Sequence, residues 1–195
     1  MDHRLVAWGR AVKSRNRQGG LPPLWLFTDA VRLPDPCAAA VRLPRGLCGV
    51  VFRDDGRADR AALGRRLAGI CRERRLVLVV AGDWRLAAAL GAGLHLRGGR
   101  RPAGASRRVP VLTSSAHDVR EVRRAVRAGV SLVFLSPAFP TASHPGAGGL
   151  GAVRWAGMAR MGGVAMAALG GIDGGNVRRL PRRVCRAAGA ISTLM

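Results

Sequence analysis

The chain has 195 residues, 48% of them hydrophobic, and a formal net charge of +22 at pH 7. This length suits one compact domain with a sizeable core. No stretch approaches the roughly eighteen uninterrupted apolar residues that a membrane-spanning helix needs. The N-terminal segment mixes charges with a short apolar run, unlike a secretory signal. We therefore expect a cytoplasmic protein that does not bind a membrane.

The charge comes almost entirely from arginine. The 33 basic residues are 32 arginines and one lysine, Lys13, and they are spread along the whole chain. Proteins that bind nucleic acids specifically often add aromatic side chains on which bases stack, whereas this chain has no tyrosine and only 4% aromatic residues. The composition predicts salt-dependent attraction to polyanions but no dedicated nucleic-acid partner.

The four cysteines lie far apart and form no CxxC pair. Three of them, Cys37, Cys48 and Cys71, fall inside apolar segments, and the fourth is Cys185. Buried free thiols are favoured over disulfides or metal ligands.

Strand-like apolar runs alternate with helix-sized segments along the chain after a basic N-terminal leader, residues 1–23. The expected strands are residues 24–28, 47–52, 76–81, 93–96, 109–113, 130–135, 164–169 and 190–194. The expected helices are residues 37–42, 60–74, 84–90, 119–128, 152–161 and 176–185, the last limited by Pro181. Residues 119–128 carry a start signal, since Asp118 and Glu121 have the spacing of a reciprocal capping pair.

Regular alternation of strands and helices with short loops predicts a parallel sheet, and eight repeats favour a closed (β/α)8 TIM barrel over an open sheet. No GxGxxG follows the first strand, which argues against a dinucleotide-binding fold. We expect a single, short barrel domain over residues 24–195 that lacks the last helix. Its bottom is then partly open or covered by the leader.

Polar residues gather where the expected strands end, at the rim that holds the active site in such barrels. The strongest signal is the loop after residues 130–135, with Gly146, Gly148, Gly149 and Gly151. Glycines there indicate either backbone mobility or close ligand approach, although a plain surface loop is an equal alternative.

The rim residues resemble thiamine phosphate synthases, in order along nearly the whole chain. The matching motifs are Phe27-Thr28-Asp29, Arg53, Asp83, His95, Ser115-Ala116-His117, Ser136-Pro137-Ala138-Phe139-Pro140-Thr141, Ala168-Leu169-Gly170-Gly171-Ile172 and Ala190-Ile191-Ser192. The resemblance implies a (β/α)8 barrel that joins a hydroxymethylpyrimidine diphosphate to a thiazole phosphate, with Mg²⁺ holding the diphosphate.

The resemblance also assigns roles to residues of this chain. It implies catalytic roles for Arg53, Ser115 and Thr141 and a metal-ligand role for Asp83. It places Arg53, Thr141, Ser143 and His144 at the diphosphate, and Gly170, Gly171, Ile191 and Ser192 at the thiazole phosphate. Backbone N–H groups beside glycines suit a phosphate, although Gly170 and Gly171 also fit an ordinary tight turn.

Several positions depart from the family pattern. Asp55 and His144 stand where lysines are expected, Gly82 replaces an asparagine, and Arg100 replaces a second metal carboxylate. One hypothesis is that Arg100 supplies the charge of the metal. His95 is most simply a core residue, and His117 fits helix capping and the site equally well.

Two alternatives follow from these departures. The chain could instead be a thiazole tautomerase-like isomerase, with His117 or His144 as the base, or a non-catalytic barrel that binds a thiamine precursor. The expected partners are small phosphorylated pyrimidine and thiazole substrates, and a homo-oligomer is compatible with the sequence.

Overall fold

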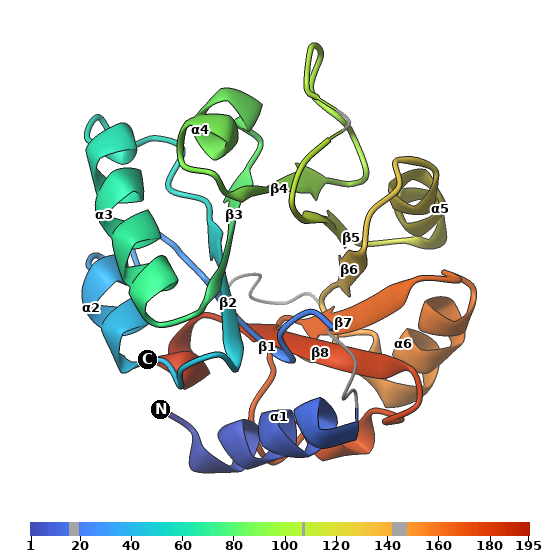
Figure 1. The fold of residues 1–195 in the computed structure, drawn as a ribbon. Coiled ribbons are helices and arrows are strands. Elements are labelled where there is room, and N and C mark those ends of the chain that lie inside the picture. Colours follow the sequence, from blue (N-terminus) through green and yellow to red (C-terminus); the bar gives the residue numbers. More distant parts are fainter. Residues whose placement is uncertain (16–19, 107, 142–147) are drawn as a thin grey trace.

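The computed structural model describes residues 1–15, 20–106, 108–141 and 148–195. Within these residues, parallel strands pair in chain order and β8 pairs with β1, which closes the barrel (Figure 1). The expected TIM-barrel fold is therefore confirmed. The strands are β1 (Leu24–Phe27), β2 (Cys48–Phe52), β3 (Val77–Ala81), β4 (Gly93–Arg97), β5 (Leu112–Ala116), β6 (Leu132–Leu135), β7 (Ala165–Leu169) and β8 (Cys185–Ala190).

Helices surround the barrel (Figure 1). They are α1 (His3–Arg15), α2 (Pro36–Arg42), α3 (Arg60–Glu73), α4 (Trp84–Ala89), α5 (Val119–Arg127) and α6 (Gly151–Arg160), with 3-10 turns η1 (Val177–Arg179) and η2 (Ser192–Leu194). In α5, Asp118 accepts the Glu121 N–H at 2.8 Å, and Glu121 accepts the His117 N–H at 2.8 Å. Among the described helices, none has the length and hydrophobicity needed to cross a membrane.

The last strand differs from its prediction. Residues 190–194 were expected as the strand, but β8 spans Cys185–Ala190 and η2 follows it. Residues 176–185 were expected to be helical, yet they contain only η1 before β8 begins. The run CRAAGA lacks the β-branched residues typical of strands, and small residues are needed here because a Cβ on Gly189 would lie 2.8 Å from the Phe27 ring.

Helix α1 packs in the outer layer of the barrel. Its buried Trp8 belongs to the hydrophobic cluster that also contains Leu24 of β1, and a Cβ on Gly9 would lie 2.7 Å from that leucine. Asp2 accepts the Gly174 N–H at 2.6 Å. In Figure 1, α1 runs beside β8, and within the described residues β8 is followed by the 3-10 turn η2.

Aromatic rings fill the barrel interior. Phe134 makes edge-to-face contacts with Trp25 and Phe27, at centroid distances of 5.5 and 4.9 Å. The Trp25 ring fits because its neighbour on β2 is a glycine, Gly49, whose Cβ would lie 2.4 Å from that ring. All four cysteines are buried and free, as predicted.

Candidate active site

A cavity of about 960 Å³ opens at the end of the barrel where the strands terminate at their carboxyl ends. Five strands contribute residues to its wall, namely β1, β4, β5, β7 and β8. The loops that follow every strand except β3 contribute as well. A volume of this size accommodates two small substrates together.

Arg53 lies at the carboxyl end of β2 and is fixed by the end of β1. Its backbone N–H donates to Thr28 Oγ1 at 2.9 Å, and its Nε donates to the Thr28 carbonyl oxygen at 3.0 Å. The guanidinium carbon is 5.4 Å from the centre of the Phe27 ring. Burial lowers the pKa of Arg53, and the nearby Asp29 opposes that shift, so the side chain keeps its charge at neutral pH.

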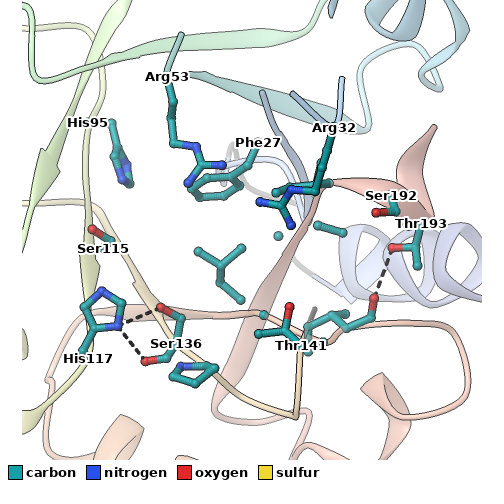
Figure 2. A pocket seen from close by; sticks show the side chains of 18 of the residues that line it. Phe27, Arg32, Arg53, His95, Ser115, His117, Ser136, Thr141, Ser192 and Thr193 are labelled. Carbon is teal, nitrogen blue, oxygen red and sulfur yellow. Dashed lines mark hydrogen bonds between the residues drawn. The ribbon is translucent and has the colours of Figure 1, made fainter. Parts of the chain in front are cut away.

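A second arginine, Arg32, lies beside it. Figure 2 shows the guanidinium groups of Arg53 and Arg32 pointing toward the same space above Phe27. Asp29 accepts from both arginines, at 2.7 Å from Arg32 and 3.5 Å from Arg53. Its hydrogen bond with Arg32 lowers the pKa of Asp29 to about 2. One side of the cavity is therefore cationic, with an ionised carboxylate behind it.

Another part of the wall, after β7 and β8, is built from backbone and hydroxyl groups. Gly170, Gly171, Ile191, Ser192 and Thr193 all line the cavity. Figure 2 shows Ser192 and Thr193 next to each other, on the same side of the cavity as Arg32. The first N–H groups of a turn such as η2 have no partner within the turn.

Gly170 and Gly171 have a structural role as well. Their φ angles are +87° and +63°, values that side chains other than glycine rarely adopt. A Cβ on Gly171 would lie 2.3 Å from the Pro140 carbonyl oxygen. The geometry therefore fits both interpretations of Gly170 and Gly171, a tightly packed turn and a close approach of the backbone to a ligand.

His117 and Ser136 form a pair at the cavity wall (Figure 2). His117 Nδ1 is 3.1 Å from the Ser136 carbonyl oxygen and 3.3 Å from its Oγ. Because a carbonyl oxygen only accepts, Nδ1 carries the hydrogen, and Nε2 keeps its lone pair when the ring is neutral. Asp118 rather than His117 caps α5.

His95 reaches the cavity from β4 but is only 2% exposed. Its Nδ1 lies 2.8 Å from Thr113 Oγ1, and its ring contacts Phe27 and Phe134. Burial lowers the pKa of His95 to about 3, with a smaller contribution from Arg53. The ring is therefore neutral at physiological pH.

Asp83, the expected metal ligand, is absent from the residues that line the cavity. One of its carboxylate oxygens accepts the Leu86 N–H at 3.0 Å and so caps α4, and the other accepts from Arg60 at 3.0 Å. Asp55 also pairs with Arg60, at 3.0 Å, and with Arg97.

These residues do not fit a magnesium site. Mg²⁺ is usually bound by one or two carboxylates together with water and substrate phosphates, whereas here each carboxylate oxygen of Asp55 and Asp83 already has a cationic or N–H partner. Within the described ranges, no group of three or more His, Cys, Asp or Glu side chains could hold a metal ion.

The remaining predicted residues divide into two groups. Ser115 and Thr141 line the cavity, whereas Ser143 and His144 lie outside the described residues. Sequence reasoning missed Arg32, Arg97 and Thr193, which also line the cavity. In a chain with 32 arginines, no sequence signal separates Arg32 and Arg97 from the other arginines.

The family model described as thiamine monophosphate synthase matches residues 35–194. The chain belongs to this family. A thiamine-phosphate synthase from Geobacillus thermodenitrificans (strain NG80-2) is 32% identical to it over 145 residues, which are 65% of this chain. That alignment spans 62% of the relative, less than two thirds of its length. The family that the rim motifs indicated is thus confirmed.

Solved structures share the barrel. A thiamine phosphate pyrophosphorylase from Pyrococcus furiosus superposes with a TM-score of 0.72 at 21% identity, covering 87% of this chain and 85% of that chain. A thiamine phosphate pyrophosphorylase from Bacteroides thetaiotaomicron gives a TM-score of 0.60 at 18% identity, covering 89% and 84%. At these identities the likeness shows the fold.

Proposed function

We propose that this chain is a transferase of thiamine biosynthesis that joins hydroxymethylpyrimidine diphosphate to thiazole phosphate and releases diphosphate. Membership of the thiamine monophosphate synthase family supports this activity. The observation that carries it is one cavity whose wall offers two kinds of group suited to anions, namely arginine side chains and, after β7 and β8, glycine backbone with hydroxyl groups.

The arginine side receives the diphosphate. Arg53 is held by Thr28 with its guanidinium directed into the cavity, and such a fork can bind two phosphate oxygens at once. Thr141 and Ser115 offer hydroxyl groups in the same cavity, and the proposal also assigns Ser143 and His144 to binding of the diphosphate.

The reaction begins when the bond between the pyrimidine methylene carbon and the diphosphate oxygen breaks. The bonding electrons leave with the diphosphate, where Arg53 stabilises the growing charge. The lone pair of the thiazole nitrogen then forms the new carbon–nitrogen bond to the methylene cation. Gly170, Gly171, Ile191 and Ser192 hold the thiazole phosphate so that its nitrogen faces this carbon.

Magnesium takes no part in these steps, because the side chains at the expected position do not fit it.

We place the reaction in the cytoplasm, since both substrates are multiply charged and do not cross a lipid bilayer unaided.

A thiazole tautomerase activity is the second candidate. His117 favours it, because its Nδ1 is held by the Ser136 carbonyl oxygen at 3.1 Å and its Nε2 is left able to take a proton. Isomerisation of thiazole phosphate without any pyrimidine would support this candidate.

The test of the main proposal is to incubate the purified chain with both substrates and to measure thiamine phosphate by mass spectrometry. Omission of either substrate is the control. Product that requires both substrates supports the transferase, and unchanged substrates contradict it.

A further inference from the structure

Arg60 occupies the space between two carboxylates beside the cavity. Its Nη2 is 3.0 Å from Asp55 Oδ1, and its Nη1 is 3.0 Å from Asp83 Oδ2. Nη2 also donates to the Ala81 carbonyl oxygen at 3.0 Å. The Arg60 side chain is only 14% exposed, so it is a fixed part of the barrel wall.

The remaining oxygens of both carboxylates are also occupied. Asp83 Oδ1 accepts the Leu86 N–H, and Asp55 Oδ2 accepts from Arg97. A divalent cation would have to displace Arg60 or Arg97 to reach these oxygens. Each displacement would break a charge-assisted hydrogen bond and, for Arg60, leave a buried cation without its partner.

Two of the arginines that line the cavity come from the end of β4 and the turn that follows it. Arg97 and Arg100 line the cavity at the two ends of this turn, and the Arg100 N–H donates to the Arg97 carbonyl oxygen at 3.0 Å. Among the described residues, no carboxylate lies within ion-pair distance of Arg100, and Arg97 pairs with Asp55.

Helix α5 fixes this turn. Arg124 donates to the Gly98 carbonyl oxygen at 2.9 Å, and the Gly99 N–H donates to Ser114 Oγ at 2.9 Å. A Cβ on Gly99 would lie 2.4 Å from the Ala125 backbone nitrogen. The two cavity arginines therefore stand on a closely packed, pre-positioned support.

Arg97 also covers the end of β3. A Cβ on Gly82 would lie 3.7 Å from the Arg97 guanidinium carbon. The guanidinium thus occupies the space beside Asp55 and above Gly82, on the cavity side of Arg60.

We propose that this chain binds the diphosphate of its substrate on arginine side chains without a divalent cation, with Arg97 and Arg100 acting together with Arg53 and with Arg60 paired to the two carboxylates that a cation would need. This inference rests on the proposed function, because it assigns the cation that balances the leaving diphosphate. Four arginines line the cavity, namely Arg32, Arg53, Arg97 and Arg100. Arg60 acts as a positioning residue, since it neutralises Asp55 and Asp83 and keeps their charge from opposing the diphosphate.

The first test measures inorganic diphosphate binding by calorimetry, in a chelator and in Mg²⁺. We expect binding in the chelator, weakened roughly tenfold or more by Arg100→Ala, as expected for loss of a charge-assisted contact. The control is Arg65→Ala, an exposed arginine on α3, which should bind as the wild type does. Binding seen only with Mg²⁺, or unchanged by Arg100→Ala, would overturn the inference.

A second test asks whether Arg60 excludes a metal. Mn²⁺ binding is followed by electron paramagnetic resonance in the wild type, Arg60→Gln and the control Arg65→Gln. Only Arg60→Gln should bind Mn²⁺, because it alone frees Asp55 Oδ1 and Asp83 Oδ2, one oxygen of each carboxylate. Equal Mn²⁺ binding by all three, or by none with Arg60→Gln folded, would contradict the role of Arg60. If Arg60→Gln does not fold, the diphosphate measurement decides.

Product formation separates this inference from the proposed function. Thiamine phosphate made in the chelator supports both. If thiamine phosphate forms only with Mg²⁺, the proposed transferase activity stands and the proposed metal-free diphosphate site is wrong. Diphosphate binding in the chelator without any product keeps the arginine site and overturns the transferase.

Discussion

Arg53 is anchored twice to Thr28, through its backbone N–H to the Thr28 hydroxyl at 2.9 Å and through its Nε to the Thr28 carbonyl oxygen at 3.0 Å. Thr28 Oγ1 in turn donates to the buried Asp54 at 2.6 Å. This chain of contacts spans the ends of β1 and β2 and leaves the terminal nitrogens of the guanidinium toward the cavity (Figure 2).

Replacing Arg53 by lysine tests the role of the guanidinium group that Thr28 holds in place. Arg53→Lys keeps the charge but loses the Nε hydrogen bond and the planar pair of donors. We expect kcat/KM for thiamine phosphate formation to fall by roughly 10- to 100-fold. Arg65→Lys, on the exposed side of α3, is the matched control and should change nothing. An Arg53→Lys enzyme as active as the wild type would show that the fork has no role.

The phosphate side can be tested with one hydroxyl. Ser192 lines the cavity and is exposed. Ser192→Ala should weaken thiazole phosphate binding by roughly tenfold or more, the value of one hydrogen bond to a charged group. The control is Ser131→Ala, which replaces an exposed serine just before β6. Calorimetric titration with thiazole phosphate measures the difference, and equal affinities for the three proteins would remove Ser192 from the site.

Packing inside the barrel predicts opposite effects for two glycines. Gly49→Ala places a Cβ 2.4 Å from the Trp25 ring, and overpacking of this kind costs about 1–3 kcal/mol of unfolding free energy. Gly69 lies in α3 with open space around its Cβ position, so Gly69→Ala should stabilise by about 0.5–1 kcal/mol. Urea unfolding of both variants measures this contrast. If the Trp25 ring can move aside without cost, Gly49→Ala will not be destabilised and the prediction is wrong.

The buried His95 predicts a dependence of stability on pH. Burial lowers its pKa from 6.5 to about 3, so between these values the unfolded chain binds a proton that the folded chain does not. Stability conferred by the neutral ring is complete above pH 6.5 and is lost as the pH falls toward 3.

The measurement is urea unfolding at several pH values between about 6 and 4.5, above the range where most carboxylates titrate. The free energy of unfolding should fall by up to about 1.4 kcal/mol per pH unit in the wild type. His95→Gln lacks this proton and should show a flatter dependence, whatever its absolute stability. Parallel slopes for the two proteins would mean that His95 is protonated in the folded state.

The barrel and its rim could be predicted because both depend on local patterns. Apolar runs at regular spacing identify parallel strands, and the residues that follow such strands meet at one edge, which is why Arg53, Ser115 and Thr141 line one cavity. The strand β8 was misplaced because its run of alanines carries no strand signal of its own. Its conformation is set by pairing with β1 and β7.

The charge arrangement beside the cavity could not be predicted. Arg60 and Asp83 are 23 positions apart, and nothing in the sequence around Arg60 distinguishes it from other arginines. Only the closed barrel brings it between Asp55 and Asp83. Asp83, which the family resemblance implied as a metal ligand, is therefore paired with Arg60, a residue outside the matching motifs.

The central claim is tested most directly by following both products of one reaction. The purified chain is mixed with hydroxymethylpyrimidine diphosphate and thiazole phosphate, and thiamine phosphate and inorganic diphosphate are measured over the same time course. The account predicts that the two products appear at equal rates and that neither appears when thiazole phosphate is omitted. Diphosphate release without thiamine phosphate, or no turnover by a folded chain that binds both substrates, would contradict it.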